Sequence, residues 1–112
     1  MNNVICVGGE EYEVLVDLDA HSQALADYGG GPNTVAMVNH MTNQITMNPL
    51  RVTTPMKFLK ALLHEVLHIL EVVNNDDFSE GALDRTAQQL AIFLVDNGLV
   101  DPEGLHWESG ME

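Results

Sequence analysis

The run from Met56 to Val73 contains neither Gly nor Pro and is apolar on nearly every side of the helix that it would form. Thr54 and Pro55 precede the run, and they offer a hydroxyl for the helix N-cap and a proline suited to the first turn. A helix on the surface would carry a broad polar face, which this run lacks. We therefore expect the helix to lie at the centre of the domain, covered by the rest of the chain.

One narrow polar stripe interrupts this apolar helix, and it consists of Lys57, Lys60, His64, His68 and Glu71. Within the stripe, residues 64–68 read H-E-x-x-H. Residues four apart lie one turn apart on the same face, so the two imidazoles can reach a single metal ion with Glu65 beside it. Two neutral imidazoles and a carboxylate next to a metal-bound water are typical of zinc hydrolases. The motif predicts His64 and His68 as ligands of Zn²⁺ and Glu65 as the general base.

A catalytic zinc site usually has three protein ligands, so the two imidazoles are too few. Glu71 lies on the polar stripe, but at 1.5 Å per residue it is about 7.5 Å along the helix axis from an ion centred between the imidazoles. A Glu side chain spans that distance poorly. We expect Glu71 to be a supporting residue or a surface charge rather than a ligand.

Glu80 and Asp84 are better placed, because they open the next expected helix and lie four residues apart on one face. That face also carries Ala87 and Ala91, whose small side chains let two helices approach closely. We expect Glu80 to be the third ligand and Asp84 to accept a hydrogen bond from the free ring N–H of a ligating His. A simpler interpretation of Glu80 stays open, in which it is a first-turn acid favoured by the helix dipole behind a Ser79 cap.

The other segments indicate a small sheet, since alternation along one strand puts four apolar side chains on a single face, namely Tyr12, Val14, Val16 and Leu18. Gly8-Gly9 predicts a turn before this strand, and Asn97-Gly98 predicts the end of the last helix. The expected elements are strands at 4–7, 12–18, 34–38 and 44–48, a weak helix at 20–27 and a second long helix at 82–95. Together they predict one α+β domain over residues 1–112, with a small, mostly antiparallel sheet packed on the central H-E-x-x-H helix, a second C-terminal helix, and a tail over about 99–112.

The stretch from Thr54 to Leu94 reads L-L-H-E-V-L-H-I-L-E, then a short polar loop, then S-E-G-A-L-D-R-T-A-Q-Q-L-A. It resembles the minimal gluzincin-type metallopeptidases common in phage and prophage genomes, and it is similar in pattern to ImmA/IrrE and SprT-like domains. The resemblance implies a zincin-like fold, and it carries over residue by residue to His64 and His68 as ligands, Glu65 as general base, Glu80 as third ligand and Asp84 as its support. The short loop departs from the pattern, because it leaves little room for a substrate-binding subdomain.

The charge balance narrows the classes of partner. Seventeen acidic side chains against four basic ones give a formal net charge of −13. Such a surface repels phosphate backbones and anionic lipids, so we expect neither nucleic acid nor a membrane as partner. The same charge favours divalent cations and basic partners, but acidity is also simply a route to solubility, which is the favoured explanation. Cys6 is the only cysteine, which excludes a disulfide framework and a cysteine-based zinc site. The first residues resemble no leader peptide, so a cytoplasmic protein is expected, in a bacterial host if a phage encodes it.

The motif predicts hydrolysis of a peptide or protein substrate, in which Glu65 takes a proton from the attacking water and later delivers it to the leaving amine. We expect an extended peptide to add to an edge of the sheet at Gln44 to Asn48. The group that stabilises the oxyanion stays open among Tyr12, Tyr28, His40, His106 and Arg85. The three His outside the motif, His21, His40 and His106, are expected to be solvated loop side chains.

Two other interpretations remain. In the first, the chain is a non-catalytic phage regulatory or interaction module that keeps the metal for folding, but a purely structural site needs no base such as Glu65. In the second, His64 and His68 are buried polar residues of a metal-free core, and both imidazoles would then need hydrogen-bond partners.

Overall fold

The computed structural model describes residues 4–31 and 33–101, and it has an α+β fold with a four-stranded sheet and three helices. His106 and most of the expected tail lie outside the described residues. None of the helices in the described part of the chain is both long and apolar enough to cross a bilayer. The elements are β1 (Val4–Val7), β2 (Glu10–Val16), α1 (Leu18–Tyr28), β3 (Ala36–Asn39), β4 (Gln44–Met47), α2 (Pro55–Asn74) and α3 (Glu80–Asp96).

The sheet has the strand order β1-β2-β4-β3. The pairs β1/β2 and β3/β4 are antiparallel as expected, but β2 and β4 are parallel, so the sheet is mixed rather than mostly antiparallel. The difference arises because α1 carries the chain from β2 to the β3–β4 hairpin, which then docks against β2 through its second strand. The prediction of an edge at Gln44 to Asn48 is therefore wrong, since β4 is an interior strand and β1 and β3 are the edges.

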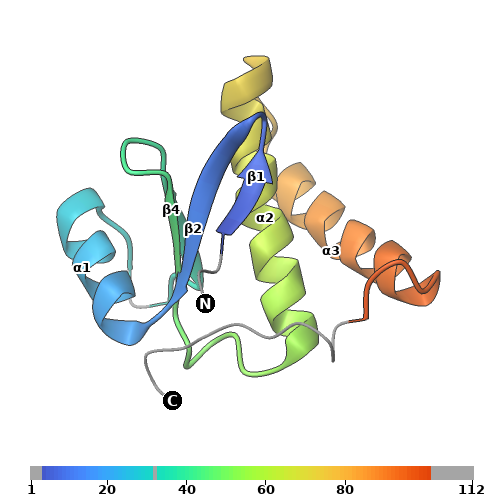
Figure 1. Cartoon of the computed structure of the whole chain (residues 1–112), viewed down its shortest axis with the longest axis horizontal. Helices are drawn as coiled ribbons and strands as arrows, with labels where there is room; N and C mark the ends of the chain where they lie inside the picture. The colour runs from blue at the N-terminus through green and yellow to red at the C-terminus, as the bar shows by residue number, and fades with distance from the viewer. Residues whose placement is uncertain (1–3, 32, 102–112) are drawn as a thin grey trace.

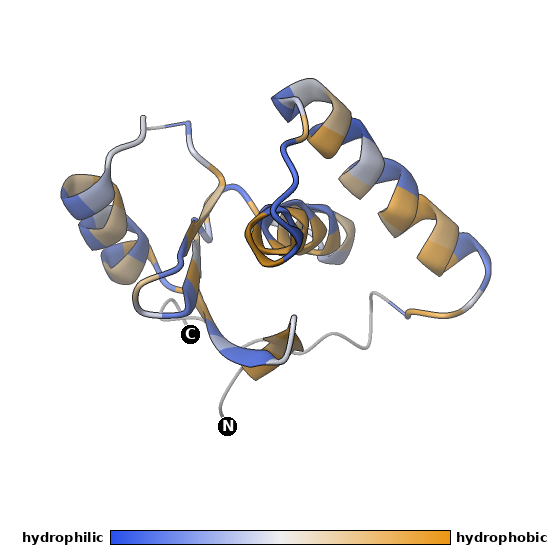
Figure 2. Ribbon diagram, turned by 90° about the horizontal axis from the view of Figure 1, so that it is seen from above, coloured by the Kyte–Doolittle hydropathy of each residue, from blue (hydrophilic) through white to orange (hydrophobic). Residues whose placement is uncertain are grey.

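The elements form layers, with α1 on one face of the sheet, α2 on the other, and α3 outside α2 (Figures 1 and 2). Val14, Ile45 and Met47 are almost fully buried between the sheet and α2. The alternation expected for β2 is confirmed at Tyr12, Val14 and Val16. Leu18 is the exception, because it starts α1 behind Asp17, whose carboxylate accepts a hydrogen bond from the Ala20 N–H.

The other face of the sheet is tied to α1 by His21, which was expected to be a solvated loop residue. The side chain of His21 is instead buried, with Nδ1 3.1 Å from Thr46 Oγ1 and Nε2 3.1 Å from the carbonyl oxygen of Thr34. Both ring nitrogens therefore have partners within the fold. This imidazole is structural, because it links α1, β4 and the loop before β3.

The expected central helix is confirmed in α2, which is seen end-on between the sheet and α3 in Figure 2. Thr54 Oγ1 accepts a hydrogen bond from the Lys57 N–H at 3.1 Å, and Pro55 occupies the first turn. The apolar sides of α2 are buried at Phe58, Leu59, Leu62 and Ile69. The imidazoles of the polar stripe, His64 and His68, stay partly accessible beside this buried side.

Ser79 caps α3 as predicted, since its Oγ accepts a hydrogen bond from the Ala82 N–H at 3.1 Å. The buried residues of α3 are Leu83, Ala87 and Ala91. Leu90, which precedes Ala91 on this helix, is exposed. The small buried side chains let α3 pack closely on α2, which brings the first turn of α3 beside the polar stripe.

Candidate metal centre

Three potential ligand groups converge where α2 meets the first turn of α3. His64 Nε2 and His68 Nε2 are 3.2 Å apart, and the Glu80 carboxylate lies 2.9 Å from the first nitrogen and 3.5 Å from the second. Ligand atoms around a tetrahedral zinc ion with bonds of about 2.0–2.1 Å are separated by about 3.3 Å. The three distances bracket this value, so the residues present fit a zinc ion.

Each imidazole has a carboxylate on its other nitrogen. Glu71 Oε1 lies 2.8 Å from His68 Nδ1, and Asp84 Oδ1 lies 3.3 Å from His64 Nδ1. A carboxylate beside Nδ1 favours the tautomer with the proton on that nitrogen, and this tautomer leaves Nε2 free to bind a metal ion. The structure thus places Asp84 where the sequence put it, and it gives Glu71 the equivalent place at the other imidazole.

Glu71 also fixes the connection between the two helices. Its second oxygen, Oε2, accepts a hydrogen bond from the Phe78 N–H at 2.9 Å, just before α3 begins. This hydrogen bond is the main reason why the pKa of Glu71 is lowered, and the hydrogen bond and positive charge of His68 act in the same direction. Glu71 is therefore neither a solvated surface charge nor close to the common point of the Nε2 atoms.

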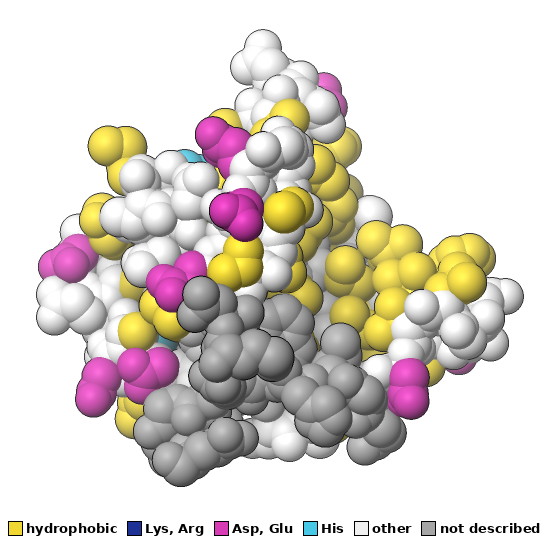
Figure 3. Space-filling view, viewed as in Figure 1, with side chains coloured by type: hydrophobic (Ala, Val, Ile, Leu, Met, Phe, Trp, Pro, Cys, Tyr) yellow, Lys and Arg dark blue, Asp and Glu magenta, His cyan; other side chains and the backbone are white. Residues whose placement is uncertain are grey.

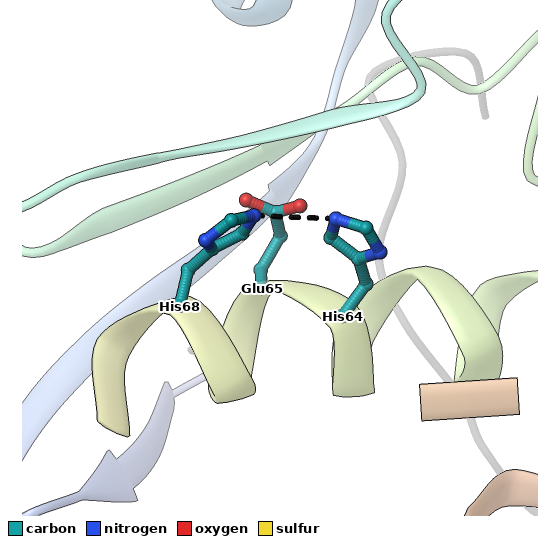
Figure 4. A group of neighbouring side chains, drawn as sticks. All are labelled: His64, Glu65 and His68. Carbon is teal, nitrogen blue, oxygen red and sulfur yellow. Dashed lines mark hydrogen bonds between the residues drawn. The ribbon is translucent and has the colours of Figure 1, made fainter. Parts of the chain in front are cut away.

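Glu65 projects from the same side of α2 as the two imidazoles, and its carboxylate lies between them in Figure 4. His64, Glu65 and His68 each offer a ligand atom within 4.8 Å of the others. The Glu65 carboxylate is buried and accepts a hydrogen bond from the Val38 backbone N–H of β3. It is close enough to touch either an ion at this point or a water bound to that ion.

Burial is the main cause that raises the pKa of Glu65, and the negative charge of Glu80 adds to it. The nearby imidazoles and the Val38 N–H oppose the rise, since each favours the ionised form. A carboxyl group with a raised pKa holds a proton more readily than a solvated one. That property suits a group that must both accept and deliver a proton.

The centre opens into a cleft of about 640 Å³ between α2, the first turns of α3 and the segment that leads into β3. His64, Glu65, Glu80 and Asp84 all line this cleft. A smaller groove on the other side of the centre is lined by His68 and Glu71 together with Val38 and His40. The candidate metal centre is thus accessible from the surface.

The residues considered for the oxyanion lie in different places. Tyr12 is buried in the core, Tyr28 is exposed at the end of α1 on the far face of the sheet, and Arg85 lies beside Gly81 on α3. His40 shares a groove with His68, so among the candidates within the described residues it alone lines a groove next to the centre. His106 lies outside the described residues.

The sequence-based predictions did not include two contacts of the centre, those of Glu71 with His68 and of the Val38 N–H with Glu65. The pairing of Glu71 with His68 had a signal, because residues three apart on a helix are neighbours, but only the distance to the ion was considered. The contact of the Val38 N–H with Glu65 had none, since any non-proline residue supplies a backbone donor.

A comparison of the chain with models of known protein families found no match. The searches of curated proteins and of solved structures gave no match either. The function of the chain has to be argued from its own site.

Proposed function

We propose that the chain is a zinc-dependent metallopeptidase with a gluzincin-like, zincin-type centre. The observation that carries this proposal is the convergence of His64 Nε2, His68 Nε2 and the Glu80 carboxylate, whose Oε1 lies 2.9 Å from the first nitrogen and whose Oε2 lies 3.5 Å from the second. A buried carboxyl group, Glu65, lies beside that point, and a cleft leads to it. Three protein ligands with a neighbouring base and open access distinguish a catalytic zinc site from a structural one.

In this proposal His64, His68 and Glu80 hold Zn²⁺, and Asp84 and Glu71 orient the two imidazoles through their Nδ1–H groups. When bound, the zinc ion acts as a Lewis acid that lowers the pKa of water and polarises the carbonyl group of the substrate. Glu65 takes the proton of the attacking water on its carboxylate and later delivers it to the leaving amine. The Val38 N–H holds the Glu65 carboxylate in place for both steps.

The edge strand beside the centre is β3, and it replaces the prediction of Gln44 to Asn48 as the place where a peptide adds to the sheet. The Asn48 N–H donates to the Val35 carbonyl oxygen at 2.9 Å, so Val35 faces β4. Backbone groups alternate in direction along an antiparallel strand, which turns those of Ala36 and Val38 toward the open side. The Val38 N–H is already bonded to Glu65, so an extended peptide can pair with the backbone groups of Ala36 and with the Val38 carbonyl oxygen, and can cross the cleft with little dependence on its sequence.

The test of the proposed function is a comparison of zinc-loaded wild type with Glu65→Gln on a mixture of random-sequence peptides, with cleavage followed by mass spectrometry. We expect hydrolysis to fall by roughly 10²–10⁴-fold in the variant, because the general base is lost. Zinc content and melting temperature should stay at the wild-type values. Glu11→Gln, which removes an exposed carboxylate on β2, is the matched control and should cleave like wild type.

The alternative is a metal-stabilised regulatory or interaction module without catalysis. The observation that favours it is the short connection over residues 75–79, which leaves no room for a substrate-binding subdomain between α2 and α3. Zinc should then raise the melting temperature of wild type and of Glu65→Gln equally, with no peptide cleaved by either. The peptidase and the metal-stabilised module both require bound zinc, whereas a metal-free core does not. Elemental analysis tests this requirement, because it should find about one equivalent of zinc in wild type and little in His64→Ala.

A further inference from the structure

The chain has four Lys and Arg residues, and three of them, Arg51, Lys57 and Lys60, line the cleft. The fourth, Arg85, does not line it. The face of the molecule drawn in Figure 3 shows several Asp and Glu side chains and no visible Lys or Arg among the described residues. In a chain with a net charge of −13, the positive charge is thus gathered at the cleft of the candidate metal centre.

Among the described residues, no carboxylate forms an ion pair with any of these three side chains. Arg51 Nη2 donates to the amide oxygen of Asn33 at 2.6 Å, and Lys57 Nζ donates to the Thr53 hydroxyl at 3.4 Å. Within residues 4–31 and 33–101, the ion pairs with carboxylates all involve His, so no Lys or Arg makes one. Basic residues with a purely structural role would be expected to pair with some of the abundant acids, so these charges are available to a ligand.

The basic side chains occupy one end of the cleft. Lys60 and Lys57 lie four and seven residues before His64 on the polar stripe, which is about 6 and 10.5 Å along the helix axis. An ion centred between His64 and His68 lies about 3 Å farther along the axis, so Lys60 and Lys57 are about 9 and 13.5 Å from it. These separations match the third and fourth residues of an extended peptide counted from the bond at the ion, because a strand rises about 3.3 Å per residue. A ligand with carboxylates at such positions would reach both lysines.

The course of β3 gives the direction of such a peptide. The segment at the start of β3, residues 34–36, lines the cleft with Lys57 and Lys60, whereas Val38 and His40 line the groove with His68. The strand β3 therefore runs alongside α2 in the same direction. A peptide that pairs antiparallel with β3, the slightly more stable arrangement, places its C-terminal part at the basic end.

On the premise of the proposed peptidase activity, we propose that the cleft selects acidic peptides, with Asp or Glu side chains on the C-terminal side of the cleaved bond held by Arg51, Lys57 and Lys60. The net charge predicted a preference for basic partners instead. The acids that line the cleft, Glu65, Glu80 and Asp84, belong to the metal centre, where a bound Zn²⁺ would offset their charge. Charges farther away than about 8 Å are largely screened at physiological ionic strength, so the cations dominate at the end of the cleft that they occupy.

The test uses zinc-loaded protein and matched decapeptides built around a bond that the wild type cleaves in the random mixture. One peptide has Glu at the third and fourth positions after the bond, one has Gln there, and one has the two Glu residues before the bond. We expect kcat/KM of wild type to be at least about fivefold higher for the first peptide than for the other two. The variant with Lys57→Gln and Lys60→Gln should lose this preference, whereas Arg85→Gln, the matched control, should keep it.

Equal cleavage of the Glu and Gln peptides by wild type would overturn the inference and leave the peptidase intact. So would a preference for Glu before the bond, a preference that survives in the Lys57 and Lys60 variant, or the same loss in Arg85→Gln. A binding measurement distinguishes a failure of the acidic-peptide preference from a failure of the peptidase proposal. Calorimetry on zinc-loaded Glu65→Gln measures peptide affinity without any hydrolysis. If wild type cleaves nothing in the random mixture, the titration uses decapeptides of arbitrary sequence with two neighbouring Glu or Gln residues. Binding of the Glu peptide that is at least about fivefold tighter through Lys57 and Lys60 then means that the acidic-peptide site stands and the peptidase does not.

Discussion

The helices α2 and α3 both contribute to the candidate metal centre, but the fold supports them differently. The sheet covers one side of α2 and α3 covers another, so its apolar residues such as Leu59 and Ile69 are buried. Within the described residues α3 packs mainly on α2, and Phe93 on its outer side is about half exposed. The side chains of the two His on α2 are 20% and 30% exposed, whereas that of Glu80 on α3 is 70% exposed.

This difference shows that the two helices hold their parts of the centre with different rigidity. The core holds the two imidazoles and Glu65 in position on α2, while the Glu80 carboxylate comes from the first turn of a helix supported on one side. An ion bound by all three ligands would tie α3 to α2, so metal binding and the docking of α3 should be coupled. Three predictions test the contrast between the two helices.

The largest effect is expected for Ile69→Ala in α2, because it opens a cavity at a fully buried position of the core. The metal-free protein should lose about 2–5 kcal/mol of unfolding free energy, measured by urea denaturation with a chelator present. Leu90→Ala on the exposed side of α3 also shortens a four-carbon aliphatic side chain to a methyl group. It should lower the unfolding free energy by less than about 1 kcal/mol. Comparable losses would mean that α3 belongs to the core as fully as α2.

The next effect concerns zinc affinity, measured by competition with a chelator of known affinity. Glu80→Ala should weaken zinc binding by well over tenfold, since it removes a proposed ligand. Glu71→Ala should weaken it by about tenfold, which exceeds the slight effect expected from its axial distance, because Glu71 accepts the Nδ1–H of His68. A larger loss for Glu71→Ala than for Glu80→Ala would show that the third ligand is misassigned.

The smallest effect is a gain of stability in metal-free Glu65→Gln. Burial raises the pKa of Glu65 above its ordinary value of 4.5, so the folded state holds the proton more tightly than the unfolded state. Stability from this group is present in full below pH 4.5 and is lost as the pH rises through the raised pKa. The variant should therefore match wild type at pH 4 and be more stable by about 0.5–2 kcal/mol at pH 7.5, measured by urea denaturation. A less stable variant at pH 7.5 would mean that the Val38 N–H contact outweighs the burial of the charge.

The sequence alone determined the elements that depend on local signals. Thr54 and Ser79 mark the starts of α2 and α3 because a capping hydroxyl acts on the backbone three residues away. The alternation at Tyr12, Val14 and Val16 located β2, and the four-residue spacing of the motif placed two imidazoles on one face of α2. These features require only the geometry of one strand or one helix.

Only the tertiary structure decided how those elements combine. The parallel pairing of β2 with β4 made β3 the edge strand, buried His21 against Thr46 and brought the Val38 N–H to Glu65. The same packing set residues 34–36 and the first turns of α3 opposite Arg51, Lys57 and Lys60 to form one cleft of an acidic chain. Such contacts join residues far apart in sequence, and they depend on the packing of whole elements, which no local spacing or capping signal encodes.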